Sequence, residues 1–382
     1  MKDHLTPQQF MAELMRYRKG SVTRRHFLGV TGLGMATTVL GAAMPGLMTR
    51  PAFAQGSIGD SVVLATWPNY YDPANFEAFT AATGAAVQVN VFGSNEEMLA
   101  KLQAGGSGWD VFVPTNYTIT TYVAEGLIDP LDLSKIPNYD AASFEPRFAE
   151  AGTVDGKLYG ASKDWGTTGM AVNTKLGGKS ISSWKEFWDI TQAEFTGRTT
   201  VHDYQLTTIG NALKSFGYSF NSVDPKELAD AEKLLLAVKP HLFAITSDYQ
   251  PPMRSGDAWL AMCWTGDAKQ LNKDMPEIQY IIGKEGGEIW SDFYAIPSSA
   301  PHKDAAYALI NFMLDPAINY KEAMFHGQPV ADARVNAMMS AEMMADPIIH
   351  PAADLLSTLE FGAAATLTNP DRAELMARFK SA

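Results

Sequence analysis

Short apolar runs alternate with amphipathic segments along the chain after residue 60. The apolar runs predict strands at residues 61–66, 86–92 and 109–114. Apolar positions at helical spacing predict a helix over 73–83 and another that opens after Ser94. Asp72 and Ser94 can cap these helices, because their side chains accept bonds from free backbone N–H groups of the first turn. This order favours a parallel sheet covered by helices, in which ligands bind beyond the carboxyl ends of the strands.

A second alternating series follows residues 155–173, an extended segment that we expect to cross from one lobe to the next. The predicted strands of this series cover residues 197–203, 258–264 and 279–282. Its predicted helices begin near residues 183, 206, 224, 267 and 303. The Met- and Ala-rich residues after 331 are expected to be helical and to pack against the second lobe. The patterns together predict an α/β protein of two lobes.

The first 54 residues have a different pattern, typical of a Tat signal peptide. Thr23-Arg24-Arg25-His26-Phe27-Leu28 places a twin arginine before a weakly apolar run, and Ala52-Phe53-Ala54 has the form of a cleavage site. The alternative is a single membrane anchor, which the glycines and prolines of the run disfavour. No later run reaches the roughly 18 apolar residues that a spanning helix needs. We therefore expect cleavage after Ala54 and a soluble periplasmic protein.

Removal of this segment makes the chain strongly acidic. Seven of the 30 Lys and Arg residues and two of the 42 Asp and Glu residues lie within it, which leaves 23 basic and 40 acidic side chains. A net charge of −17 repels nucleic acid and favours cationic ligands, although many exported proteins are acidic for solubility alone. We expect no nucleic-acid partner.

Two pairs of one tryptophan and one aspartate suggest a cation site. Trp290 and Asp292 stand two apart in a predicted strand, so their side chains project from the same face. Trp264 and Asp267 stand at the end of another predicted strand. An aromatic face attracts an ammonium or guanidinium group, and a carboxylate accepts its hydrogen bonds. Two such pairs indicate a ligand with more than one positive centre. The alternative is structural, because Trp is commonly a core residue and Asp a turn former or helix cap.

Aromatic side chains also follow two predicted strands of the first series. Trp67 and Tyr70 follow the first strand, and Thr115 and Tyr117 follow the third. At the carboxyl ends of parallel strands these side chains would face a ligand; the alternative is that they cap the core. The adjacent pair Tyr70 and Tyr71 resembles an iron-binding phenolate pair, but no nearby His and Glu complete such a site. We expect no metal.

The sequence gives little support for catalysis or for a cofactor. Cys263 is the only cysteine, which excludes an internal disulfide, a cysteine-ligated iron–sulfur cluster and a structural zinc site of the usual type. The motifs G-x-S-x-G and H-E-x-x-H and a phosphate loop do not occur. The histidines after the signal peptide are scattered singly at positions 202, 241, 302, 326 and 350. We predict a protein that is not an enzyme and has no cofactor. An exported enzyme is the alternative, because Tat export often serves proteins that fold around a cofactor.

Six motifs together resemble the periplasmic polyamine-binding proteins of ABC importers. They follow the order of that family and span nearly the whole chain after the signal peptide. The motifs are W-x-x-Y (67–70), S-N-E-x-M-x-A-K-L (94–102), W-D-V-F-V-P-T-N-Y (109–117), W-x-G-D (264–267), K-E-G-G-x-x-W-x-D-x-x-A-I-P (284–297) and A-L-I-N-F-M-L-D-P (308–316).

This resemblance implies a type II periplasmic-binding fold whose two lobes close on a linear polyamine and deliver it to a membrane permease. It places lobe 1 at residues 55–166 plus about 293–325, and lobe 2 at residues 167–292 plus about 326–382. The implied ligand-binding residues are Trp67, Tyr70, Thr115, Tyr117, Asp203, Trp264, Asp267, Trp290, Asp292 and Gln328. The expected form is a monomer.

One departure from the family pattern concerns ligand length. The family often has an acidic residue three positions after the one that matches Asp203, where this chain has Leu206. Loss of that amine partner disfavours spermidine, and Pro68 also favours a shorter or less polar ligand. A binding protein for putrescine or a similar diamine is the leading hypothesis. A binding protein for another organic cation, such as a guanidino compound or an amino acid derivative, is the alternative.

Overall fold

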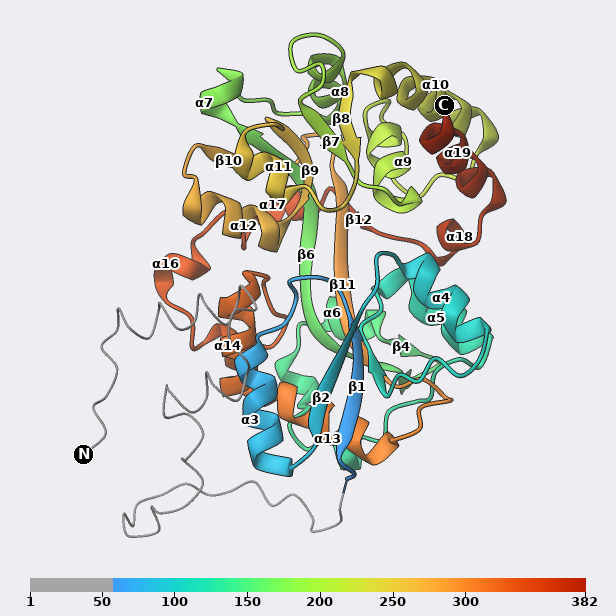
Figure 1. Cartoon of the computed structure of the whole chain (residues 1–382), viewed down its shortest axis with the longest axis vertical. Helices are drawn as coiled ribbons and strands as arrows, with labels where there is room; N and C mark the ends of the chain where they lie inside the picture. The colour runs from blue at the N-terminus through green and yellow to red at the C-terminus, as the bar shows by residue number, and fades with distance from the viewer. Residues whose placement is uncertain (1–57) are drawn as a thin grey trace, which may run out of the picture. The chain divides into compact units, whose positions relative to one another are not determined.

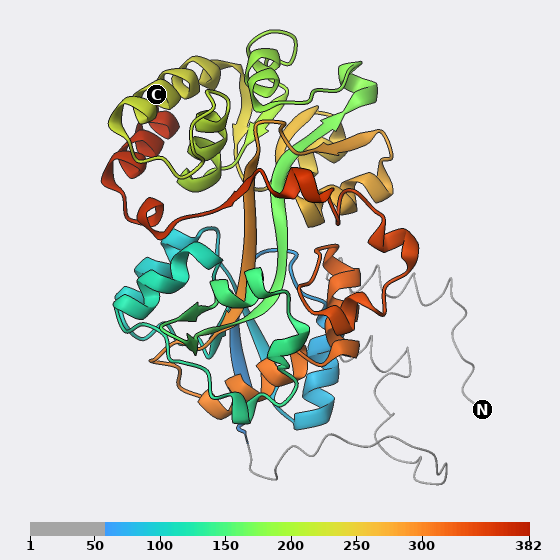
Figure 2. The same cartoon turned by 180° about the vertical axis from the view of Figure 1, so that it is seen from behind.

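The computed structural model describes residues 58–382 (Figures 1 and 2). The predicted Tat signal peptide, with its twin arginine and its cleavage site, lies outside these residues. Within residues 58–382, no helix has the length and the apolar character needed to cross a lipid bilayer.

The first series of elements is a parallel β-α-β-α-β unit, as the sequence predicts. Its elements are β1 (Ser61–Thr66), α3 (Pro73–Thr83), β2 (Ala86–Val91), α4 (Asn95–Gln103) and β3 (Val111–Phe112). Strand β1 lies between β2 and β3 and is parallel to both. Both predicted caps are confirmed: the side chain of Asp72 accepts a bond from Ala74 N at 2.9 Å, and that of Ser94 accepts one from Glu97 N at 3.1 Å.

Two long antiparallel strands, β6 (Gly160–Asn173) and β11 (Gly287–Ala295), run side by side through the middle of the fold (Figure 1). All residues of both strands are buried. Strand β6 confirms the extended crossing predicted within residues 155–173. It follows a short hairpin of β4 (Thr153–Val154) and β5 (Lys157–Leu158).

The rest of the main sheet is built on β6. Its strands are β7 (Thr199–Val201), β8 (Leu242–Ile245), β9 (Leu260–Trp264) and β10 (Ile278–Ile281). Strands β9 and β10 are antiparallel to β6, whereas β7 is parallel to both β8 and β9. The order is β2-β1-β3-β11-β6-β9-β7-β8. The sheet is therefore mixed and not purely parallel, because β11 inserts antiparallel between β3 and β6.

Helices cover this sheet. They are α5 (Ile119–Ala124), α6 (Pro146–Ala151), α7 (Thr174–Gly177), α8 (Trp184–Gln192), α9 (Gln205–Lys214), α10 (Pro225–Val238), α11 (Gln250–Ser255), α12 (Thr265–Asp274), α13 (Lys303–Met313), α14 (Pro316–His326), α15 (Ala333–Asn336), α16 (Ala341–Met344), α17 (Ala353–Leu356), α18 (Ala364–Leu367) and α19 (Pro370–Ser381). Short 3-10 turns occur at η1 (Asn116–Thr118), η2 (Leu133–Lys135), η3 (Ala141–Ser143) and η4 (Lys239–His241).

Separate hydrophobic cores support the two lobes. One core joins residues of β1, α3 and α13, including Val62, Phe79 and Leu309. Another joins α8, α9 and β9, including Trp188 and Met262. Burial of large apolar side chains in two places satisfies the predicted two-lobed α/β organisation.

The C-terminal segment differs in part from its prediction. It contains short helices, but it also adds β12 (Leu359–Phe361), which pairs in parallel with β11. Helix α19 buries Leu375, Met376 and Phe379 in the core around α8 and α9, as expected for packing against the second lobe. Strand β8 and helix α11 are also absent from the prediction, and β3 and β7 are shorter than the apolar runs that contain them.

Gly166 of β6 allows the indole of Trp290 to lie against the neighbouring strand. The two residues are register partners, and a Cβ atom at Gly166 would stand 2.4 Å from Trp290 Cζ2. We expect Gly166→Ala to lower the free energy of unfolding by about 1–3 kcal/mol, as overpacking does. Urea denaturation measures this change. Gly93→Ala is the control, because its Cβ atom would meet only Glu97 Oε2 at 3.6 Å. Equal denaturation midpoints for the two variants would contradict the prediction.

Candidate functional site

A cavity of about 480 Å³ opens beyond the strand ends β1, β3 and β9 and along one face of β11. All ten residues predicted from the sequence line it: Trp67, Tyr70, Thr115, Tyr117, Asp203, Trp264, Asp267, Trp290, Asp292 and Gln328. The structure thus brings together side chains that are separated by more than half of the chain.

The exit of β1 is held in place by hydrogen bonds. Trp67 Nε1 donates to the carbonyl oxygen of Val113 at 3.0 Å, and the indole meets the ring of Phe92 edge to face at 4.7 Å between centroids. The hydroxyl of Thr115 accepts a bond from Asn95 Nδ2 at 3.2 Å. These contacts fix the positions of Trp67 and Thr115 at the edge of the cavity.

Two predicted acids on the opposite wall already have partners. Both carboxylate oxygens of Asp267 accept bonds, from the hydroxyl of Tyr249 at 2.6 Å and from Gln250 Nε2 at 2.7 Å. Burial raises the pKa of Asp267, and these two bonds oppose the rise. Asp203 accepts a bond from the hydroxyl of Ser247 at 2.6 Å. Trp264 lines the same cavity, with its ring centroid 4.4 Å from that of His202.

The third wall is strand β11, which presents Glu288, Trp290 and Asp292 to the cavity at alternate positions. Glu288 is 2 % exposed, and its Oε2 accepts a bond from the hydroxyl of Thr168 at 2.6 Å. Burial raises the pKa of Glu288 to about 7, against the lowering effect of that bond. Trp290 Nε1 has no hydrogen-bond partner within residues 58–382.

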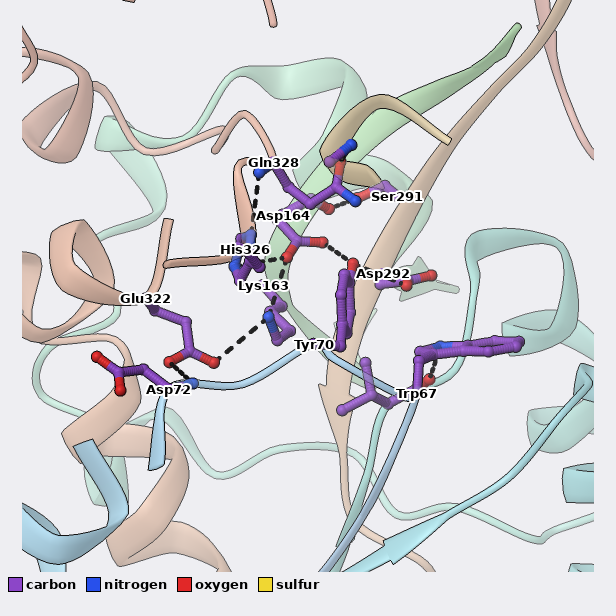
Figure 3. Close-up of polar contacts among 12 residues, drawn as sticks. Trp67, Tyr70, Asp72, Lys163, Asp164, Ser291, Asp292, Glu322, His326 and Gln328 are labelled. Atoms are coloured by element: carbon purple, nitrogen blue, oxygen red, sulfur yellow. Dashed lines mark hydrogen bonds and ion pairs between the residues drawn. The ribbon is translucent and has the colours of Figure 1, made fainter. Parts of the chain in front are cut away.

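Tyr70 links Asp292 to a second buried carboxylate, Asp164 (Figure 3). Its hydroxyl lies within hydrogen-bond distance of Asp164 Oδ1, and it is 3.0 Å from Asp292 Oδ2. A phenol has one proton and can donate to one acceptor only. Both contacts are hydrogen bonds if one of the two carboxyl groups carries a proton of its own.

The surroundings of Asp164 show which carboxyl group carries the proton. Its Oδ2 is 3.0 Å from Lys163 Nζ and 3.3 Å from His326 Nε2. His326 Nδ1 accepts a bond from Gln328 N, so the neutral ring carries its proton on Nε2. The two groups that favour the ionised form of Asp164 are the ammonium of Lys163 and the hydroxyl of Tyr70. Burial, and then the charge of Asp164, raise the pKa of Asp292 well above its usual range, which favours a proton on Asp292 over one on Asp164.

Lys163 supplies the positive charge for this buried group. Its side chain is 3 % exposed, and Nζ lies 4.0 Å above the centroid of the Tyr70 ring and 3.7 Å from Glu322 Oε1. Glu322 in turn accepts bonds from Asn75 Nδ2 and from Asp72 N, at the start of α3. We define Tyr70, Lys163, Asp164, Glu322 and His326 as the lysine cluster. It lies next to the cavity at Tyr70 and His326.

Sequence reasoning missed Glu288 and the whole lysine cluster apart from Tyr70. Glu288 could have been found, because it continues the alternation of Trp290 and Asp292. His326 was one of five scattered histidines, and nothing local marks its contact with Asp164. Leu206, considered for its effect on ligand length, is 1 % exposed and packs near Tyr117 and Gly362; it does not line the cavity.

Comparison with known proteins identifies the family. The family model described as bacterial extracellular solute-binding protein matches residues 74–351. The chain belongs to this family. A solved spermidine/putrescine ABC transporter substrate-binding protein from Streptococcus pneumoniae matches with a TM-score of 0.69 and 27% identity, over 84% of this chain and 99% of that one. The predicted two-lobed type II periplasmic-binding fold is thereby confirmed.

The curated relatives are binding proteins of transport systems. A spermidine/putrescine-binding periplasmic protein of Salmonella typhimurium is 31% identical over 81% of this chain and 88% of its own. A putrescine-binding periplasmic protein of Pseudomonas aeruginosa is 28% identical over 80% of this chain and 88% of its own. Among residues 58–382, no group of three or more His, Cys, Asp or Glu side chains is placed to hold a metal ion.

Lys163→Met tests the lysine cluster. The change leaves Asp164 and Glu322 buried beside an apolar side chain, and loss of one partner of a buried ion pair costs about 3–5 kcal/mol. We expect the free energy of unfolding at pH 7 to fall by about that amount in urea denaturation. Lys135→Met is the control, because the pair of Lys135 with Asp304 is exposed and should contribute little. A loss no larger than that of the control would contradict the role of Lys163.

Proposed function

We propose that the protein is the substrate-binding component of an ABC importer and captures putrescine or a related polyamine. The observation that carries this proposal is Asp292, a buried carboxyl group that lines the cavity near Trp290 and whose Oδ1 has no hydrogen-bond partner among the residues that the structure describes. The relatives named for spermidine and putrescine support the same ligand class.

The cavity suits an alkyl ammonium for two physical reasons. An ammonium that leaves water must be paired with a carboxylate, since an unpaired buried charge is costly. Asp292 can provide this pairing directly. Trp67, Trp264 and Trp290 can enclose the methylene chain, and each cation–π contact adds roughly 0.5–2 kcal/mol.

Transport follows from closure of the lobes. Ligand contacts that exist only in the closed state shift the lobes from open to closed, and a membrane permease then recognises the closed form. For this motion we retain lobe 1 as residues 55–166 plus about 293–325, and lobe 2 as residues 167–292 plus about 326–382. The proposal includes a monomer exported by the Tat translocon with cleavage after Ala54, supported by the twin arginine at Arg24 and Arg25.

A second candidate ligand is a guanidino compound or another small organic cation. Asp203 favours it, because its carboxylate lines the cavity, accepts one bond from Ser247 through Oδ1, and could accept a donor of a guanidinium group through its other oxygen. Titration with agmatine and γ-aminobutyrate beside putrescine and spermidine separates these classes.

Asp292→Asn tests the proposed amine partner. We expect the variant to bind putrescine at least 1.5 kcal/mol more weakly, which is about tenfold, because a charged hydrogen bond is lost. Isothermal titration of residues 55–382 measures the affinity, and thermal unfolding checks that the fold persists. Asp60→Asn, at an exposed position before β1, is the matched control. Unchanged affinity would remove Asp292 from the site, and product formed from the amine would favour an enzyme instead.

Amine binding should release a proton from Asp292. At pH 8 Glu288 is largely ionised, since its pKa is about 7, whereas the pKa of Asp292 lies well above its usual range. An ammonium favours the ionised form of Asp292, so a rise in pH strengthens binding while the amine stays charged. We expect the binding enthalpy at pH 8 to be more exothermic in MOPS than in phosphate, because the released proton is taken up by the buffer. Equal enthalpies would show that Asp292 is already ionised.

A further inference from the structure

We propose that Glu288 forms a second cation subsite, which holds the far ammonium or guanidinium group of a ligand whose first cation pairs with Asp292. The proposal rests on the proposed function and extends it, because it assigns the second charge of the ligand to a particular side chain. No acidic residue at position 206 is needed for this role.

The first argument is the missing counter-charge of Glu288. Among the described residues its one hydrogen bond comes from Thr168, and no Lys, Arg or His forms an ion pair with it. The titratable groups that face it are Tyr117 of η1, Tyr204 before α9 and Tyr280 of β10, and all of them are neutral phenols near pH 7. A buried carboxylate with one neutral donor has unused acceptor capacity, which a cation in the cavity can fill.

The second argument is position along β11. Glu288 and Asp292 lie four residues apart on one face of a fully buried strand, and both line the same cavity. Four residues of extended strand span about 13 Å between backbone positions, and the two side chains can incline toward each other across Trp290. The indole between them suits the apolar middle of a chain with a cation at each end.

The third argument is the contrast with the other acids of the cavity. Both oxygens of Asp267 are occupied by Tyr249 and Gln250, and Asp203 is bound by Ser247. Within residues 58–382, Asp292 Oδ1 has no partner, and Glu288 has one bond for its two oxygens. Asp203 also has one bond, but its side chain is partly exposed to water, so the two buried carboxyl groups of the cavity with unused oxygens are those on β11. They select a ligand with two cationic ends over a monoamine, and over an amino acid whose carboxylate Glu288 would repel.

Isothermal titration at pH 8 with matched ligands tests this assignment. The ligands are putrescine, cadaverine and 1,6-diaminohexane, each compared with the alkyl monoamine of equal carbon number. For Glu288→Gln we expect diamine affinity to fall about 10- to 100-fold, as for a lost charged hydrogen bond, and monoamine affinity to change little. Asp292→Asn should weaken both classes. Glu288→Asp keeps the negative charge but shortens the side chain by one methylene. This variant should still prefer diamines to monoamines, but the diamine that binds most tightly should have a longer methylene chain than in the wild type.

The outcomes distinguish this inference from the proposed function. If the wild-type protein binds none of the amines, the proposed function is wrong. If it binds diamines and Glu288→Gln leaves the ratio of diamine to monoamine affinity unchanged, the second subsite is wrong. An equal loss of diamine and monoamine affinity is one such case, and it would show that Glu288 has a structural role. Glu77→Gln, at an exposed position of α3, is the matched control and should leave the ratio unchanged.

Discussion

The cost of burying carboxylates without enough positive charge governs this structure. Asp164, Glu288, Asp292 and Glu322 are buried and Asp267 is half-buried, and desolvation raises the pKa of each of them. The desolvation cost of these carboxyl groups can be offset in two ways. The lysine cluster supplies an internal ammonium to Asp164 and Glu322. Asp292 and Glu288 form no such pair within residues 58–382, and we propose that a cationic ligand pairs with them. Under this proposal, the same physical penalty that lowers stability provides affinity for a cation.

The arrangement around Tyr70 resembles the one that the cavity offers to its proposed ligand. Lys163 places an ammonium over an aromatic face and beside an aspartate. Trp290 and Asp292 present an aromatic face and an aspartate with no ammonium between them. Tyr70 joins the two halves through its contacts with both aspartates. One half is therefore complete within the chain, and under our proposal a bound ligand completes the other.

Local patterns in the sequence explain why much of this could be predicted. Asp72 and Ser94 cap helices through bonds within their own turns, and the spacing of Trp290 and Asp292 fixes their common face on any strand. The lysine cluster could not be found in this way, because Lys163, Glu322 and His326 meet only through tertiary packing. Position 206 shows a related limit: the sequence reveals that Leu206 is not acidic, but only the fold shows that it packs near Tyr117 and away from the cavity. The antiparallel insertion of β11 likewise depends on contacts between distant parts of the chain.

The place of β11 in the sheet has a consequence for the order of folding. Strand β3 belongs to the first unit of the chain, yet its second neighbour is β11, which is synthesised after nearly all of the other strands. Before β11 is synthesised and pairs, β3 and β6 each have one edge without a hydrogen-bonded neighbour strand. Contacts between residues so far apart in sequence form slowly, and strand edges that stay unpaired during this time promote aggregation. An export route that accepts a finished fold would allow this late pairing to occur inside the cell, before the protein reaches the compartment where it works.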